Sequence, residues 1–140
     1  MDIEYKWKTF EQLTKDELYA LLNLRQEVFI VEQECPYNDL DYSDQDAFHL
    51  LAFHEKRLIG YLRAFVPGIK YNESSIGRII TIIEHRKKGI GKKMVNEGIS
   101  FLLNQYPNND IVISAQHRLI NFYQDLDFKE RGEVYLEDNI

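Results

Sequence analysis

Cysteine and long apolar runs are scarce in this chain, and each shortage excludes a class of protein. One cysteine among 140 residues excludes an intrachain disulfide and fits a reducing compartment. No stretch approaches the ~20 apolar residues of a membrane helix, and the N-terminus lacks a signal-peptide pattern. Repeats and linker-like tracts are also missing. We therefore expect one domain over residues 1–140, located in the cytoplasm and without a membrane partner.

Basic residues are outnumbered and unevenly placed. Seventeen basic and 23 acidic residues give a net charge of -6. This charge disfavours nucleic acid as a partner, because a phosphate backbone requires a broad basic face. The basic residues crowd between Arg86 and Lys93, and the acidic ones between Glu32 and Asp46. One end therefore favours anions and the other favours cations, unless both are simply solvated surface.

Hydrophobic periodicity predicts alternating strands and helices. We expect strands at residues 5–10, 48–55, 57–67, 75–83, 110–115 and 128–137. Helices are expected from the Thr14 N-cap to residues 30–33, from the turn at 87–91 to Pro107, and over 117–126. The second helix should bury Ile90, Met94, Val95, Ile99, Leu102 and Leu103. The order describes an α/β sandwich on a mixed sheet, with strand 75–83 in a central position.

The clearest chemical signal lies between that strand and the second helix. The segment Arg86-Lys87-Lys88-Gly89-Ile90-Gly91-Lys92 combines glycines, cations and a helix N-terminus. Free backbone N–H groups and the helix dipole attract anions there, and glycines let a ligand approach the backbone. The segment therefore indicates a phosphate or pyrophosphate site. It is neither a Walker A motif nor the three-glycine dinucleotide fingerprint. An ordinary basic turn is the alternative.

The same segment carries a resemblance to a known family. Arg86-x-x-Gly89-x-Gly91 matches the Gln/Arg-x-x-Gly-x-Gly/Ala signature, and the chain resembles the GNAT acetyltransferase superfamily. Further segments are similar to its ElaA-like branch: Leu24-Arg25, Val28 to Gln33, Cys35 to Tyr37, Ile76 to Arg78, Ser114 to Gln116, Asn121 to Tyr123 and Gly132 to Asp138. The resemblance implies the GNAT acyl-CoA N-acyltransferase fold, a mixed central sheet with helices on both faces, and allows a homodimer.

The chain departs from the family pattern in two places. Asp127 stands where the family usually has a glycine, although aspartate tolerates the left-handed conformation better than most residues. The chain also stops at Ile140, where the ElaA pattern continues into a final strand. We therefore expect that strand to be missing, or its place to be filled by another chain or an altered pairing.

The resemblance also implies roles for individual residues around acetyl-CoA, with no metal. Backbone groups of Ile79, Ile80 and Thr81 would pair with the pantetheine amides. The pyrophosphate would be held by Arg86, Lys87, Lys88, Gly89, Ile90, Gly91 and Lys92. Gln116 stands where the family often has a cofactor-contacting asparagine. Tyr123 falls on the family's tyrosine, whose hydroxyl would protonate the departing thiolate. The general base stays unassigned.

The acceptor side is less defined. The acidic loop at Glu32 to Asp46 would favour a cationic amine as a charged rim, or it is merely solvated. The resemblance implies that Arg25, His49 and Arg63 share the acceptor groove with Glu32, although each alone also suits a structural role. Cys35 suits a structural role. The sequence thus predicts an N-acetyltransferase that moves acetyl from acetyl-CoA to a primary amine of a small molecule or peptide. A non-catalytic CoA-binding module and a protein-interaction module on the same fold are the alternatives.

Overall fold

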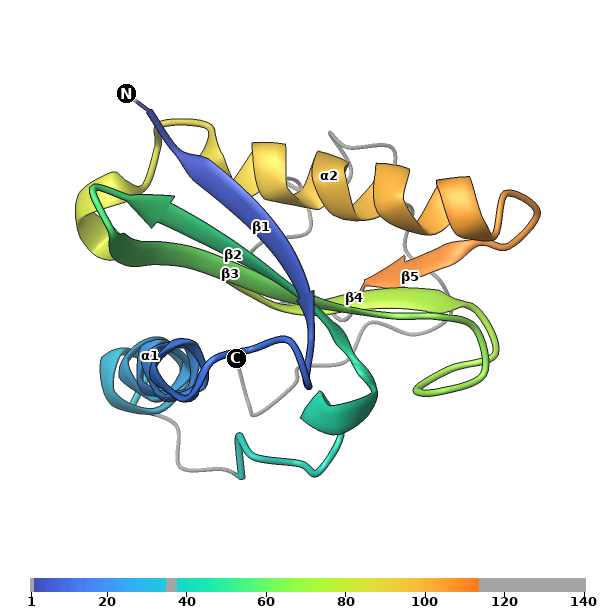
Figure 1. Cartoon of the computed structure of the whole chain (residues 1–140), viewed down its shortest axis with the longest axis horizontal. Helices are drawn as coiled ribbons and strands as arrows, with labels where there is room; N and C mark the ends of the chain where they lie inside the picture. The colour runs from blue at the N-terminus through green and yellow to red at the C-terminus, as the bar shows by residue number, and fades with distance from the viewer. Residues whose placement is uncertain (1, 35–37, 114–140) are drawn as a thin grey trace.

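A computed structural model describes residues 2–34 and 38–113 of the chain (Figure 1). Its strands are β1 (Glu4–Thr9), β2 (Phe48–His54), β3 (Arg57–Phe65), β4 (Ser74–Thr81) and β5 (Ile111–Ile113). Its helical segments are α1 (Lys15–Arg25), the π-helical continuation η1 (Gln26–Glu32), the 3-10 turns η2 (Asp44–Asp46) and η3 (Ile83–His85), and α2 (Ile90–Gln105). Most ends lie within two residues of the predicted bounds.

The described strands form one mixed sheet in the order β1-β2-β3-β4-β5. The first four pair antiparallel, and β5 pairs parallel to β4 over Ile76 and Ile113 and the two residue pairs before them. The predicted hairpin is confirmed: Glu55 and Lys56 join β2 to β3 with positive φ angles of 50° and 67°. Such angles suit the primed turns that match strand twist. As expected, β4 lies inside the sheet.

Helices cover both faces of the sheet, as predicted, with α1 on one side and α2 on the other (Figure 1). The predicted capping box at α1 is confirmed. The Thr14 hydroxyl accepts from the Glu17 N–H at 3.0 Å, and the Glu17 carboxylate accepts from the Thr14 N–H at 2.9 Å. This box fixes where the helix begins. Leu21, Leu24 and Val28 then point into the core.

Helix α2 packs tightly against the other face. A Cβ added to Gly98 would lie 2.9 Å from Ile76 Cδ1, so a larger residue there would require the Ile76 side chain to move. The Phe101 ring stacks on Trp7 with 4.3 Å between centroids, which joins α2 to β1. The prediction that Leu103 is buried is wrong, since it is 40% exposed. It follows the fully buried Leu102 and therefore points about 100° away around the helix. The predicted helix 117–126, strand 128–137 and missing final strand lie outside the described residues.

Candidate functional site

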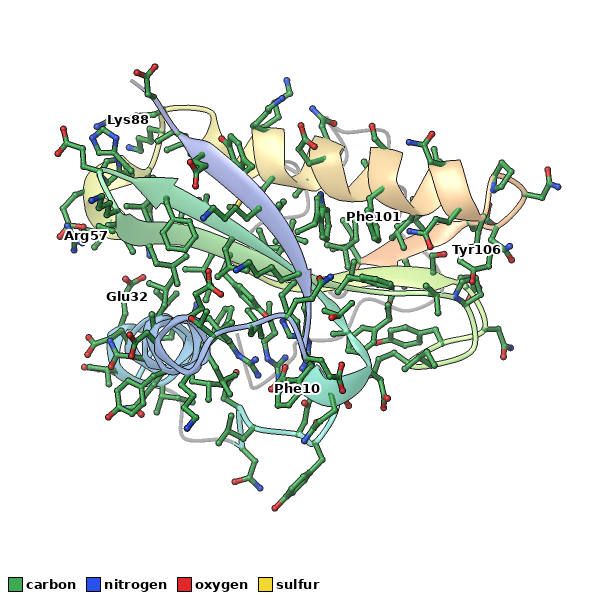
Figure 2. The ribbon with its side chains drawn as sticks, viewed as in Figure 1. Phe10, Glu32, Arg57, Lys88, Phe101 and Tyr106 are labelled. Carbon is green, nitrogen blue, oxygen red and sulfur yellow. The ribbon has the colours of Figure 1, made fainter. Side chains whose placement is uncertain are left out.

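The turn between η3 and α2 has the geometry of an anion site. Gly89 is the helix N-cap, in the left-handed conformation with φ 80° and ψ 5°. Ile90, the first helical residue, is buried and anchors the turn in the core. Lys87, Lys88 and Lys92 remain exposed, with Lys88 at the turn leading into α2 (Figure 2). The predicted residues therefore gather around one exposed helix N-terminus.

The backbone amides of this N-terminus remain available to a ligand. Gly89 has no side chain to cap the helix, and the first helical bond runs from the Lys93 N–H to the Gly89 carbonyl at 3.0 Å. The amides that precede Lys93 in this first turn have no carbonyl one turn earlier to bond. The dipole of a helix this long adds partial positive charge at the same place. Lys87, like Gly89, has a positive φ, of 64°, which is a costly conformation for lysine.

Strand β4 changes register at the start of the predicted cofactor-binding backbone. Tyr61 pairs with Ile80 and Arg63 pairs with Gly77, so two residues of β4 oppose the single Leu62 of β3. This extra residue makes a β-bulge at Arg78 and Ile79. The bulge was not predicted, although a glycine inside a strand pattern, here Gly77, is a usual signal of one.

The described pairing between β4 and β5 ends just before the bulge. Within the described residues, pairing with β5 stops at Ile76 and Ile113, and Gly77, Ile80 and Thr81 pair only with β3. The Ile80 side chain is buried in the core, so only its backbone can meet a ligand. Ile79 and Thr81 are partly exposed. The predicted pantetheine-binding backbone therefore begins in the bulge, at Ile79, and continues through Ile80 and Thr81.

Arg86 and Glu32, which the sequence analysis assigned to different substrates, form an ion pair. The Arg86 Nη1 and Nη2 atoms donate to the two Glu32 carboxylate oxygens, both at 2.9 Å. The Arg86 Nε atom donates to the Thr81 carbonyl at 2.7 Å. Glu32 lies on the α1 side of the sheet (Figure 2). Arg86 thus ties the end of β4 to the end of η1, and the lysines supply the unpaired charge of the turn.

Arg25 and Arg63 lie in a buried ion network rather than on an open groove surface. Arg25 donates to Asp39 at 2.8 Å and to Asp44 at 2.7 Å. Arg63 donates to Asp44 and Asp41, both from Nη1 at 2.9 Å. The circuit closes through a further arginine of β4 and alternates positive and negative side chains. We call it the arginine–aspartate ring, and its members are Arg25, Asp44, Arg63, Asp41, Arg78 and Asp39.

The ring uses acids that the sequence analysis placed on a charged rim. Asp39 and Asp44 are buried, and Asp41 is also bound by Lys70 at 3.2 Å. Burial alone would raise the pKa of Asp41, but the hydrogen bonds and charge of Arg63 outweigh burial, so this pKa lies well below its usual range. Three acids of the loop are therefore neutralised inside the protein. The expected dense acidic rim is therefore reduced to the acids of the loop that lie outside the ring.

His49 is fully buried beside the ring. Its Nε2 atom lies 2.9 Å from the Asp44 carbonyl, which only accepts, so Nε2 carries the proton. Its Nδ1 atom then accepts from the Tyr61 hydroxyl. Burial, together with the charges of Arg25 and Arg63, lowers the pKa of His49. A neutral imidazole in this tautomer satisfies both partners, so His49 supports the loop from beneath.

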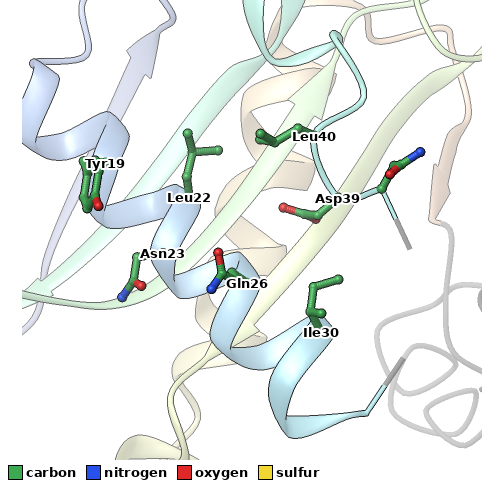
Figure 3. Close-up of a pocket in the computed structure, with 8 residues that line it drawn as sticks. Tyr19, Leu22, Asn23, Gln26, Ile30, Asp39 and Leu40 are labelled. Carbon is green, nitrogen blue, oxygen red and sulfur yellow. The ribbon is translucent and has the colours of Figure 1, made fainter. Parts of the chain in front are cut away.

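A surface hollow of about 480 Å³ lies between α1 and the acidic loop (Figure 3). Leu22, Gln26 and Ile30 of the helical segment face Asp39 and Leu40 of the loop across it. Its wall mixes apolar side chains with carboxamides; the full lining is Tyr19, Leu22, Asn23, Gln26, Ile30, Asn38, Asp39 and Leu40. Asp39 belongs to both the hollow and the ring. The hollow is thus connected to the bulge of β4 through the ion pair between Asp39 and Arg78.

Several predictions fall outside the described residues. Tyr123, Gln116 and Cys35 are among them, so the roles of the first two stay predictions. In the part of the chain that is described, no three or more His, Cys, Asp or Glu residues are arranged to hold a metal. A reaction without metal also stays a prediction. No helix among the described residues has the length and apolar character required to span a membrane.

Comparisons with known proteins place this geometry in a family. The sequence model of the acetyltransferase (GNAT) domain matches residues 10–140. The UPF0039 protein sll0451 of Synechocystis is 38% identical, covering 100% of this chain and 92% of the relative. Protein ElaA of Escherichia coli is 34% identical, covering 99% of this chain and 92% of the relative.

Solved structures agree with these sequence matches. The crystal structure of Escherichia coli ElaA superposes with a TM-score of 0.91 at 33% identity, covering 97% of this chain and 93% of that one. An acyl-CoA N-acyltransferase from Pseudomonas aeruginosa gives a TM-score of 0.92 at 35% identity, covering 99% and 94%. The predicted fold and the predicted similarity to the ElaA-like branch are both confirmed.

Proposed function

This chain belongs to the GNAT acetyltransferase family. We propose that it moves an acetyl group from acetyl-CoA to a primary amine. Membership of the family supports acyl transfer from an acyl-CoA. The choice of acetyl as the group and of an amine as the acceptor is our proposal. The single observation that carries it is the exposed turn at Gly89, which has no side-chain cap and is tied to the end of β4 through Arg86.

The chain's residues fit the shape and charge of such a donor. The pyrophosphate would accept hydrogen bonds from the amides of residues 88–92, with charge from Lys87, Lys88 and Lys92. The pantetheine amides would pair with the backbone of Ile79 to Thr81 as an added strand does. Arg86 would support this site by fixing the Thr81 carbonyl, to which it donates at 2.7 Å. Gln116 would make a further contact to the donor.

The proposed reaction is a direct attack within a ternary complex. The amine nitrogen bonds to the thioester carbonyl carbon while the carbon–sulfur bond breaks. A backbone N–H near Thr81 would stabilise the negative charge that develops on the carbonyl oxygen. The CoA thiolate takes a proton from the Tyr123 hydroxyl, and the amine nitrogen loses a proton to solvent or a loop carboxylate. These steps give an amide and free CoA.

The acceptor would enter on the side of α1 and the acidic loop, where the hollow of Figure 3 lies. Arg25, His49 and Arg63 would serve binding by holding this loop in place, since all three side chains are buried. Glu32 is partly exposed despite its pairing with Arg86, so it can meet both the acceptor side and the turn. A homodimer is compatible with this proposal and is not required by it.

A comparison of two charge reversals tests the donor site. Lys88→Glu places a negative charge at the turn, and we expect CoA to bind at least about tenfold more weakly, equal to ~1.4 kcal/mol. Lys15→Glu makes the same charge change on the exposed first turn of α1 and should leave CoA binding unchanged. Calorimetric titration with CoA measures both. Equal affinities in the two variants would refute the pyrophosphate site.

Turnover needs a separate measurement. Consumption of acetyl-CoA should be followed against polyamines, aminoglycosides, amino acids and peptide N-termini, with and without Tyr123→Phe. The proposal expects release of free CoA that depends on an amine and is slowed by the Tyr123 substitution. CoA binding without turnover on any amine would instead support a non-catalytic module.

A further inference from the structure

Arg78, at the bulge of β4, holds a backbone conformation that its residue type disfavours. Its φ of 51° lies in the left-handed region, where a Cβ crowds the following carbonyl. The neighbouring Gly77 could adopt such an angle at little cost, yet its φ is not positive. Non-glycine residues keep this conformation only where surrounding contacts force it. Something must therefore hold Arg78.

The Arg78 side chain is held by the acidic loop. Its Nε atom lies 2.9 Å from Asp39 Oδ1, and its Nη2 atom donates to the Asp39 carbonyl at 3.3 Å. The side chain is only 13% exposed, so solvent screens the ion pair weakly. Asp39 is fixed in turn by Arg25, which donates to its carboxylate at 2.8 Å and its carbonyl at 2.9 Å. The bulge is thereby anchored to α1.

The anchor lies where it can set the position of the predicted pantetheine-binding backbone. The bulge ends at Ile79, and Ile80 and Thr81 follow it with the register that the extra residue sets. If the bulge relaxed, these backbone groups would shift along β3. Other ring members reach the same place from β3, since Arg63 pairs with Asp41, which lies 3.7 Å from Arg78. Contacts from several elements thus hold the strained backbone conformation of Arg78.

We propose that the Arg78–Asp39 ion pair holds the β4 bulge in its left-handed conformation and so positions the backbone of Ile79 to Thr81 against the acyl thioester. This inference rests on the proposed function. Arg78 is in this sense a positioning residue, because it acts through the strand and not on the reacting atoms. Its loss should then lower the rate of transfer and leave the binding of the pyrophosphate end of CoA intact.

The test compares two truncations of the same side chain. Arg78→Ala and Arg78→Gly both remove the ion pair, but only glycine adopts the left-handed conformation without strain. We expect kcat of the Gly variant to exceed that of the Ala variant by about tenfold, with CoA dissociation constants within about twofold of each other. Equal kcat values would overturn the inference, as would an effect confined to CoA affinity. Thermal melting of both variants shows the folded fraction to which kcat is referred.

A second variant keeps the test decisive if either truncation fails to fold. Asp39→Asn leaves Arg78 in place and weakens its anchor, so kcat should fall with CoA affinity retained. NMR coupling constants at residue 78 should report a left-handed φ in the wild type and its loss in Asp39→Asn. A wild type that neither binds CoA nor consumes acetyl-CoA refutes the proposed function. The NMR result still decides on the anchor, since an unchanged φ in Asp39→Asn refutes it.

Discussion

Asp44→Asn should lower the free energy of unfolding more than an aspartate-to-asparagine substitution at an exposed position does. Asp44 Oδ1 accepts from Arg25 at 2.7 Å and from Arg63 at 2.9 Å. These arginine side chains are 0% and 4% exposed. Asp44→Asn keeps the shape of the side chain but leaves the ring with three arginines and two aspartates. The excess positive charge would then be buried.

The size of the effect follows from burial. Removing one partner of a buried ion pair costs about 3–5 kcal/mol, because the other charge remains desolvated. Arg25 keeps Asp39 and Arg63 keeps Asp41, so we expect the lower end, about 3 kcal/mol. At roughly 2–4 °C per kcal/mol for a chain of this size, Tm should fall by about 6–12 °C.

Urea denaturation followed by circular dichroism measures this loss, and Asp46→Asn is the matched control. Asp46 belongs to the same 3-10 turn but is exposed, so its substitution should change the free energy of unfolding by less than about 0.5 kcal/mol. If Asp44→Asn and Asp46→Asn unfold within about 1 kcal/mol of each other, the ring is not a buried unit, and the reasoning from burial fails.

Two further predictions concern Gly89 and His49. Gly89→Ala should lower the free energy of unfolding by about 1–2 kcal/mol, and Gly89→Asn should lower it by less. A Cβ at Gly89 would meet no atom within 4 Å, so the cost comes from the φ of 80°, which asparagine tolerates better than alanine. Equal urea midpoints for the two variants would contradict that angle. The pKa of His49 is lowered by burial, so the unfolded chain binds a proton more readily than the folded one. Its contribution to stability is present above about pH 6.5 and is lost as pH falls through the lowered pKa. Urea midpoints between pH 5 and 8 should therefore fall less steeply on acidification in His49→Gln than in the wild type, and parallel curves would show that His49 is not the group responsible.

The features that the sequence predicts well depend on residues close together in the chain. The capping box joins Thr14 to Glu17, and the turn before α2 spans only residues 86–92. Alternating and helical apolar patterns likewise reflect local burial, which is why strand and helix positions were predicted closely. The confirmed part of the fold is thus the part in which local chemistry and global packing agree.

The ring could not be found in this way. Arg25 and Asp39 are 14 positions apart, Arg63 and Asp41 are 22 apart, and Arg78 and Asp39 are 39 apart. A run of acids in a sequence indicates a solvated or ligand-binding surface, unless the fold is known to bring arginines beneath it. The ion pair between Arg86 and Glu32 escaped prediction for the same reason, since 54 positions separate them.

Neutralisation within the acidic loop bears on the acceptor chemistry that we propose. Asp39, Asp41 and Asp44 each accept from an arginine, and Glu32 is paired with Arg86, so they are poor partners for the ammonium of a cationic substrate. The hollow offers carboxamides from Asn23, Gln26 and Asn38 between apolar side chains. Carboxamides both donate and accept, so under our proposal they would suit hydroxyl or amide groups beside the reacting amine. Because an amine must be uncharged to attack, a site that does not stabilise the ammonium form also avoids raising the pKa of its own substrate.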